Sequence, residues 1–312
     1  MKTKKKVSIV VPVYYNEESL PRLFEELQGV SLSSSDFDFE FIFVDDFSGD
    51  NSYQVLQSYL GISKSKIKIL KLSKNHGSFT ACLAGLTKSD GDCAVIISAD
   101  LQDPPALISK MISEWSNGYE VVIAARNSRK DSFFTKIFAT MFYWLIRRYA
   151  LTDMPKGGFD FVLFDRKIID IVCEIKEKNT SLMGLIIWAG FKRKVLYYDR
   201  QTRKRGSSRW TLAKKIKYFI DSFVSFSFVP IRLATIVGFT VSFLGFLYTV
   251  FIIYERLVNK QLVQGIVTLI ALVLFLGGAQ LIILGIIGEY LWRILDETRK
   301  RPPFIIDKFD RN

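Results

Sequence analysis

Short apolar runs alternate with helical patterns through the first part of the chain. Runs rich in β-branched and aromatic residues, typical of buried strands, occupy residues 7–13, 39–44, 67–72, 94–97 and 121–125. Helical spacing of apolar residues follows the first three runs, through Leu27, over 52–60 and over 79–86. Strands that alternate with helices of this length predict a mostly parallel sheet covered on both faces, so we expect an α/β fold.

Acidic side chains follow two of these strands. Asp45 and Asp46 come directly after the second strand, and Asp100 and Asp103 come just after the fourth, with Gln102 between them. If the strands are parallel, both groups lie at the carboxyl ends of the strands, where open α/β sheets bind their ligands. Carboxylate and amide oxygens at that edge can hold a divalent cation against the phosphates of a substrate. The alternative is a pair of turns with solvated acids.

The last third contains two long apolar runs. Val229–Tyr254 carries one charge, Arg232, near its start, and Leu262–Gly288 carries none. Each run exceeds the roughly 20 residues that cross a bilayer, so we expect a transmembrane hairpin. Basic residues flank the hairpin on its outer sides, whereas its connection has little net charge, and the positive-inside rule therefore predicts a cytoplasmic α/β domain and C-terminus. No signal peptide is expected at the N-terminus.

Two further stretches are aromatic and amphipathic. Residues 133–149 fit either a buried core helix or a helix lying in the membrane interface, and both interpretations stay open. Residues 216–228 form a second such stretch. The expected organisation is a cytoplasmic α/β domain over 1–210, a juxtamembrane amphipathic helix over 211–228, two transmembrane helices over 229–288 and a cytoplasmic basic tail over 289–312.

Charge and composition narrow the chemistry. The formal net charge of +12 indicates an anionic partner, which could be nucleic acid, lipid headgroups or a phosphorylated substrate. Within the basic stretch 192–217, Arg203–Arg209 combines glycine and serines with arginines suited to phosphate, although a charge run is also typical of a solvated face. His76 is the only histidine and the three cysteines are scattered, so neither a zinc site nor a Ser-His-Asp triad is expected. The chain has no GxGxxG and no Walker A loop.

Several motifs occur in an order that resembles one enzyme family. They are Val11–Glu18 at the first strand, the acid turn Val44–Asp50, the loop Asn75–Gly77, the segment Ala99–Pro105, the motif Gly158–Phe161 and the basic loop Arg205–Arg209. Over nearly its whole length the chain resembles the membrane-anchored family 2 glycosyltransferases that act on polyprenyl phosphates. This family includes bactoprenol glucosyltransferases and dolichol-phosphate mannose synthases.

The resemblance implies a GT-A (Rossmann-like) fold and an inverting transfer of a hexose to undecaprenyl phosphate, with glucose from UDP-glucose as the expected donor sugar. Nucleotide-sugar contacts are expected from Pro12, Tyr14, Glu17, Asp45, Asp46, Asn75, Gly77, Ser98, Ala99 and Asp100. Asp100 and Gln102 are expected to hold Mg²⁺ or Mn²⁺, and Asp160 is the expected catalytic residue, orienting the acceptor phosphate or taking a residual proton. Contacts to that phosphate are expected from Arg126, Arg203, Ser207 and Arg209. Nucleic acid is not an expected partner, and self-association stays open.

Two departures from the family pattern leave alternatives. Ser98 stands where the family usually has the first acid of Asp-x-Asp, and Val162 stands where an arginine is usual. The first shortens the metal motif, and the second requires that acceptor charge be met elsewhere, for example by the basic loop. The alternatives are the same reaction with GDP-mannose or a modified UDP-sugar, or a catalytically silent protein that binds lipid or nucleotide. A processive synthase is disfavoured, because two spans offer no channel and no Gln-x-x-Arg-Trp motif is present.

Overall fold

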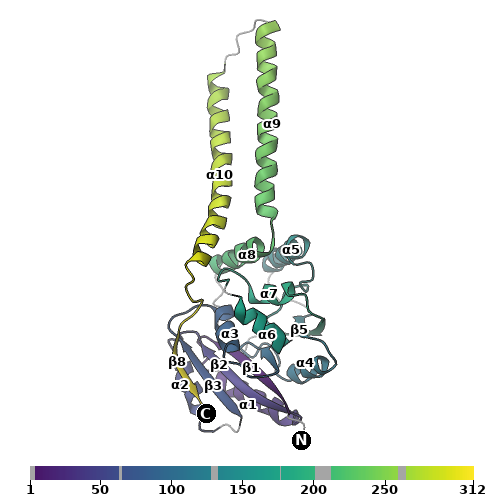
Figure 1. The fold of residues 1–312 in the computed structure, drawn as a ribbon, viewed down its shortest axis with the longest axis vertical. Helices are drawn as coiled ribbons and strands as arrows, with labels where there is room; N and C mark the ends of the chain where they lie inside the picture. The colour runs from purple at the N-terminus through teal and green to yellow at the C-terminus, as the bar shows by residue number, and fades with distance from the viewer. Residues whose placement is uncertain (1–3, 63–64, 128–132, 176, 201–211, 259–264) are drawn as a thin grey trace. The chain divides into compact units, whose positions relative to one another are not determined.

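The structure, a computed structural model, describes residues 4–62, 65–127, 133–175, 177–200, 212–258 and 265–312. The chain divides into two compact units, of which the first comprises Met1–Phe223 with Pro302–Asn312 and the second Val224–Arg301 (Figure 1). The chain therefore leaves the first unit, builds the second and returns to the first for its last residues.

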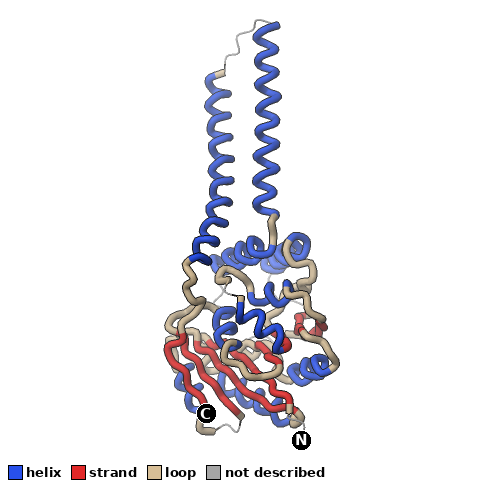
Figure 2. Tube along the Cα trace, viewed as in Figure 1, coloured by secondary structure: helices blue, strands red, loops and turns tan. Residues whose placement is uncertain are grey.

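The described residues of the first unit build an 8-stranded sheet in the order β7-β5-β6-β4-β1-β2-β3-β8 (Figure 2). Its strands are β1 (Lys5–Val13), β2 (Phe37–Asp45), β3 (Lys66–Leu72), β4 (Cys93–Ile96), β5 (Val121–Arg126), β6 (Phe161–Asp165), β7 (Arg193–Tyr198) and β8 (Ile306–Arg311). β2 and β4 flank β1, and all three run parallel, as do β2 with β3 and β5 with β7. β6 and β8 are antiparallel to their neighbours. The expectation of a mostly parallel sheet is confirmed.

Helices cover both faces of this sheet. Those that pack on it are α1 (Leu20–Ser33), α2 (Ser52–Tyr59), α3 (Ser78–Leu86), α4 (Leu107–Ser116) and α6 (Arg166–Glu174). Three further helices are α5 (Phe133–Tyr149), α7 (Leu182–Trp188) and α8 (Leu212–Phe226). Alternate strand residues such as Ile9 and Phe41 share one buried core with α1, α2 and α4. On the other face α3 packs so close that a Cβ at Gly85 would lie 2.5 Å from Val10 Cγ1. Only glycine permits this approach without a shift of the sheet.

Several elements of the first unit have no counterpart in the sequence prediction, namely α4, β6, α6, α7, β7 and β8. The strand β8 is the clearest difference, because residues 289–312 were expected only as a basic tail. Its sequence is Ile-Asp-Lys-Phe-Asp-Arg, which lacks the apolar run of a buried strand. Charged side chains of this kind suit a strand at the edge of a sheet, where one face and one side meet solvent.

The second unit contains two long helices, α9 (Val229–Val258) and α10 (Ile266–Thr298). Within the described residues, Val229–Glu255 and Phe275–Thr298 are long and apolar enough to cross a membrane. Their large apolar side chains, such as Phe239 and Leu281, are exposed. The two predicted apolar helices are therefore present, and the second continues past Gly288 to Thr298. That extension carries an ion pair one helical turn apart, with Arg293 Nε 3.0 Å from Glu289 Oε1.

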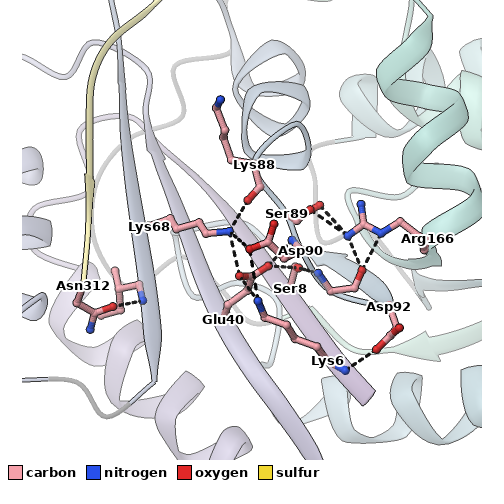
Figure 3. Close-up of polar contacts among 12 residues, drawn as sticks. Lys6, Ser8, Glu40, Lys68, Lys88, Ser89, Asp90, Asp92, Arg166 and Asn312 are labelled. Carbon is pink, nitrogen blue, oxygen red and sulfur yellow. Dashed lines mark hydrogen bonds and ion pairs between the residues drawn. The ribbon is translucent and has the colours of Figure 1, made fainter. Parts of the chain in front are cut away.

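A buried charge cluster joins the strands at the end of the sheet away from the predicted acidic edge (Figure 3). The side chain of Glu40 in β2 is fully buried, and its Oε2 lies 2.8 Å from Lys6 Nζ and 3.1 Å from Lys68 Nζ. Its Oε1 accepts hydrogen bonds of 2.6 Å from Ser8 Oγ and from the backbone N–H of Asp90. One carboxylate thus ties β1, β2, β3 and the turn before β4 together in a fixed register.

Candidate active site

The carboxyl ends of β1, β2 and β4 and the amino end of β6 meet at one edge of the sheet. Val13 pairs with Asp45, and the backbone N–H of Asp46 donates to the Val13 carbonyl at 2.9 Å. Asp160 immediately precedes β6, which runs antiparallel to β4 with Val162 opposite Ile96. The reversed direction of β6 therefore brings Asp160 to the edge where Asp45 and Asp100 already lie. The expectation that the acid groups share one edge is confirmed for the backbone.

The backbone at this edge adopts rare dihedral angles. Of the described residues, four non-glycine residues have positive φ, and three of them follow the strands of this edge. They are Tyr15 after β1 (φ 57°), Phe47 after β2 (φ 62°) and Leu101 after β4 (φ 57°). Left-handed backbone at bulky residues is rare and clusters at functional sites, where the surrounding structure holds it in place. No sequence pattern marks these three positions, because none of them is glycine or asparagine.

Asp45 and Asp46 have different surroundings, although both are buried. Both carboxylate oxygens of Asp46 accept backbone hydrogen bonds, from the N–H of His76 at 2.7 Å and of Gly77 at 2.8 Å. Asp45 Oδ1 accepts from the N–H of Ser48 at 3.2 Å, whereas its buried Oδ2 has no hydrogen-bond partner among the described residues. Burial raises the pKa of Asp45, opposed by the bonds from Ser48. Asp45 therefore has an acceptor atom to offer a ligand, and Asp46 holds the neighbouring loop.

The predicted contacts Tyr14 and Glu17 are held by neighbouring asparagines. The backbone N–H of Tyr14 donates to Asn16 Oδ1 at 2.9 Å. Both carboxylate oxygens of Glu17 accept from Asn51, one from its backbone N–H and one from its side chain, each at 3.0 Å. Asn51 is the residue before α2, so Glu17 joins the loop after β1 to the loop after β2. Pro12 lies inside β1 opposite Val44.

The segment after β4 supplies oxygen atoms around Asp100, whose side chain is half-buried. Ser98 Oγ donates to Asp100 Oδ1 at 2.5 Å, and the backbone N–H of Gln102 reaches the same oxygen at 3.2 Å. The carbonyl of Ala99 accepts from Ser19 Oγ at 2.8 Å, which ties the segment to the start of α1. Hydroxyl, carboxylate and amide oxygens are hard donors that fit Mg²⁺ or Mn²⁺. No group of three or more His, Cys, Asp or Glu side chains that could hold a metal occurs among the described residues. These oxygen atoms therefore fit a cation that takes its remaining ligands from substrate phosphates and water.

Asp103 is fully buried, like Asp45, but its partners are side chains that come from the far end of the sheet order. The hydroxyl of Tyr198 donates to its Oδ1, and Arg200 Nε lies 3.3 Å from the same atom. Burial raises the pKa of Asp103, while Arg200 and Tyr198 act in the opposite direction. The sequence grouped Asp103 with Asp100 as possible oxygen ligands, whereas in the structure Tyr198 at the end of β7 and Arg200 just after it enclose the Asp103 carboxylate.

Arg126, predicted as a phosphate contact, forms an ion pair with Asp160. Its Nη2 lies 2.5 Å from Asp160 Oδ2, and its side chain is 13% exposed against 51% for Asp160. Burial opposes the charge on Arg126, but Asp160 and Asp103 raise its pKa above the ordinary value. Arg126 therefore stays charged and fixes one oxygen of Asp160, leaving the rest of that carboxylate open to solvent.

Comparison with known proteins decides the family. The profile described as Glycosyl transferase family 2 matches residues 8–171, more than half of the chain. The chain belongs to glycosyltransferase family 2. It is 39% identical to the uncharacterized glycosyltransferase YkcC of Bacillus subtilis, over 96% of this chain and 93% of that protein. It is 33% identical to the SfII prophage-derived bactoprenol glucosyl transferase of Shigella flexneri, over 98% of this chain and 99% of that protein. It is also 33% identical to the undecaprenyl-phosphate 4-deoxy-4-formamido-L-arabinose transferase of Proteus mirabilis, over 97% of this chain and 93% of that protein.

The matched region of this family 2 glycosyltransferase contains Asp45, Asp100, Arg126 and Asp160. The residues that enclose Asp103 come from β7 and lie outside it. Sequence reasoning missed Tyr198 and Arg200, since β7 itself was not predicted. The only signal was that Arg200 belongs to the basic stretch 192–217. Arg203, Ser207 and Arg209, which were expected to contact the acceptor phosphate, lie outside the described residues.

Helix α5 of the glycosyltransferase, whose sequence fitted either a buried core helix or an interfacial helix, has one packed side and one exposed side. Phe142 packs against α8, with ring centroids 5.9 Å from Tyr218 and 5.6 Å from Phe219. Met141 and Trp144 are exposed, with about half of the surface of each residue in contact with solvent. One side of the described part of α5 therefore packs on the first unit, and another presents an apolar and aromatic surface.

Proposed function

We propose that this glycosyltransferase transfers a hexose, glucose from UDP-glucose, with inversion to undecaprenyl phosphate at the cytoplasmic face of a membrane. The observation that carries the proposal is the convergence of Asp45, Asp100 and Asp160 at one sheet edge. The relatives named as bactoprenol glucosyl transferase and undecaprenyl-phosphate 4-deoxy-4-formamido-L-arabinose transferase support a polyprenyl phosphate acceptor, because they match the chain over nearly its full length.

The donor occupies the carboxyl ends of β1, β2 and β4 in this proposal. Asp45 offers its unpartnered Oδ2 to the nucleoside, and Asp46 keeps the Asn75–Gly77 loop in place beside it. Asp100 and Gln102 would hold a divalent cation. Such a cation would supply Lewis-acid chemistry, because it would neutralise the charge that builds on the leaving diphosphate. Ser98 stays within reach of Asp100 and orients its carboxylate through a 2.5 Å hydrogen bond.

The acceptor phosphate meets the sugar beside Asp160. A phosphate monoester has its second pKa near 6, so the attacking oxygen is already deprotonated at neutral pH. Asp160 therefore acts by orientation, through the oxygen that Arg126 does not fix. Arg126 positions Asp160, so the charge of the incoming phosphate is met mainly by the basic run that follows Arg200.

The membrane anchor in this proposal is the pair α9 and α10, whose apolar stretches match the thickness of a bilayer. The basic residues outside the hairpin support a cytoplasmic position for both flanks, by the positive-inside rule. Exposed aromatic side chains such as Trp144 and Tyr149 on α5 suit the headgroup region, where ring and polar edge both find partners.

The test is a panel of radiolabelled donors incubated with membranes that contain undecaprenyl phosphate, with lipid-extractable label as the readout. UDP-glucose should give labelled lipid, and Asp160→Asn should abolish it while Asp38→Asn, an exposed acid in the same sheet, should not. If only GDP-mannose or a modified UDP-sugar gives labelled lipid, that compound, and not UDP-glucose, is the donor. Nucleotide binding without any transfer would overturn the catalytic proposal in favour of a silent binding protein.

A further inference from the structure

Tyr198 lies where three parts of the candidate site meet. It is the last residue of β7 and pairs with Arg126, the last residue of β5. The backbone N–H of Asn127 donates to the carbonyl of Tyr198 at 2.9 Å, which keeps the two strand ends together. The side chain of Tyr198 is buried, with 8% of the residue exposed, so both its hydroxyl and its ring meet protein.

The hydroxyl of Tyr198 binds the segment that carries the expected cation ligands, residues 98–103. It donates to Asp103 Oδ1, and Asp103 directly follows Gln102 and lies three residues after Asp100. Arg200 Nε, 3.3 Å from the same oxygen, adds a charge but no hydrogen bond, and Asp103 Oδ2 has no hydrogen-bond partner among the described residues. The Tyr198 hydroxyl is therefore the hydrogen bond that fastens the far end of this cation segment.

The ring of the same residue packs against the acceptor motif. The ring centroids of Tyr198 and Phe161 are 6.3 Å apart and the ring planes lie at 82°, an edge-to-face contact. Phe161 is fully buried and directly follows Asp160. Asp160 is in turn bound by Arg126, from the strand position opposite Tyr198. One side chain thus contacts the cation segment through its hydroxyl and the neighbour of the acceptor acid through its ring.

We infer that Tyr198 is a positioning residue that fixes the cation segment relative to Asp160, so that cation affinity depends on the Tyr198 hydroxyl. The inference rests on the proposed function, because a cation on Asp100 and Gln102 belongs to it. Groups that orient ligands from outside the ligand set commonly control metal affinity. The simpler interpretation is a buried hydrogen bond that stabilises the fold, whose loss leaves the cation affinity of the folded protein unchanged.

The experiment uses the full-length protein in lipid nanodiscs and measures UDP binding by calorimetry, once with Mn²⁺ and once with EDTA. Mn²⁺ should tighten UDP binding to the wild type. Tyr198→Phe should raise the Kd of UDP in Mn²⁺, and the Kd of Mn²⁺ at saturating UDP, about two- to tenfold, the value of one hydrogen bond. The Kd of UDP in EDTA should stay unchanged, because Asp45 and Asp46 accept hydrogen bonds from other loops.

Tyr53→Phe is the matched control for this measurement. It also takes a tyrosine hydroxyl from a carboxylate, since the Tyr53 hydroxyl donates to Asp310 Oδ2 at 2.7 Å, but it does so on α2. Tyr53→Phe should therefore bind UDP with the wild-type affinity in both Mn²⁺ and EDTA.

The two contacts of Tyr198 can be separated by transfer kinetics. Tyr198→Phe keeps the ring beside Phe161, so the KM for undecaprenyl phosphate should remain at the wild-type value. Tyr198→Ala removes the ring as well and should raise this KM about two- to tenfold, the value of one aromatic pair, in addition to the Kd of Mn²⁺.

Amide hydrogen exchange provides a readout that needs no ligand. The N–H of Gln102, which donates to Asp100 Oδ1 at 3.2 Å, should exchange faster in Tyr198→Phe than in wild type and Tyr53→Phe. Wild-type binding of UDP with Mn²⁺ by Tyr198→Phe, or an equal loss in Tyr53→Phe, would overturn the inference. Equal affinity of the wild type for UDP in Mn²⁺ and EDTA would instead refute the proposed cation site. Unchanged exchange at Gln102 would refute the link between Tyr198 and the cation segment, whatever the metal does.

Discussion

The substitution Glu40→Gln tests the buried charge cluster, because it removes one charge and keeps the size of the side chain. The amide would place N–H groups toward the ammonium groups of Lys6 and Lys68, where the carboxylate now accepts. Breaking a buried ion pair by removing one partner costs about 3–5 kcal/mol. Lys68 keeps Asp90 and the carbonyl of Lys88, each at 2.6 Å, so we expect the lower end of this range, about 3 kcal/mol. For a unit of this size that loss lowers the melting temperature by about 6–12 °C.

The assay is urea and thermal unfolding of the full-length protein in detergent, followed by intrinsic fluorescence. Glu26→Gln is the matched control, since Glu26 forms an exposed pair with Arg22 at 2.9 Å on α1, worth at most about 0.5 kcal/mol. Equal losses in the two variants would refute the assignment of Glu40 as the group that ties the strands together.

The stability that Glu40 provides should also depend on pH. Burial raises its pKa, but the hydrogen bonds from Lys6 and Ser8 and the other partners outweigh burial, so the pKa lies below the ordinary value of 4.5. A carboxyl whose pKa is depressed by folding contributes fully above its unfolded pKa, and the contribution disappears as the pH falls through the folded pKa. The difference between wild type and Glu40→Gln should therefore be constant from pH 6 to 8 and shrink below about pH 4.5. A difference that grows as the pH falls would contradict this sign.

Three further substitutions test the site. Asp100→Ala should abolish transfer and leave the unfolding curve unchanged, measured with labelled donor and by fluorescence; a wild-type rate would remove Asp100 from the reaction. Ser98→Asp adds a second carboxylate beside Asp100 and should tighten Mn²⁺ binding in a calorimetric titration, whereas an unchanged titration would place residue 98 outside the ligand set. Tyr198→Phe takes the hydroxyl from buried Asp103 and should cost about 1–3 kcal/mol in urea unfolding and slow transfer. If Tyr198→Phe changes neither the stability nor the transfer rate, this hydrogen bond is dispensable.

Much of the site could be predicted because its signals are local. Continuous apolar runs marked β1 to β5, and acids placed after such runs lie at one edge whenever the strands are parallel. Asp45 and Asp100 were predicted in this way. The motif Gly158–Phe161 indicated Asp160, but only the antiparallel direction of β6 explains how a residue before a strand reaches the same edge as residues after strands.

The partners of these acids could not be predicted, because they come from distant parts of the chain. Asp103 lies next to Gln102 in sequence and was grouped with Asp100 as a possible oxygen ligand, yet Tyr198 encloses it from β7. Glu40 lies within a strand, where alternation suggests a solvated side chain, and is buried because lysines from β1 and β3 meet it. Which carboxylate is free and which is paired depends on strand order, and strand order is set by packing between segments.

The sequence by itself determined the α/β class, the two apolar helices and the family motifs, since each is recorded in the spacing of a few neighbouring residues. Only the tertiary structure decided the reversal of β6, the enclosure of Asp103 by Tyr198 and the return of residues 302–312 to pair with β3. These depend on contacts between residues far apart in the chain, whose free energy exists only when the whole sheet has formed.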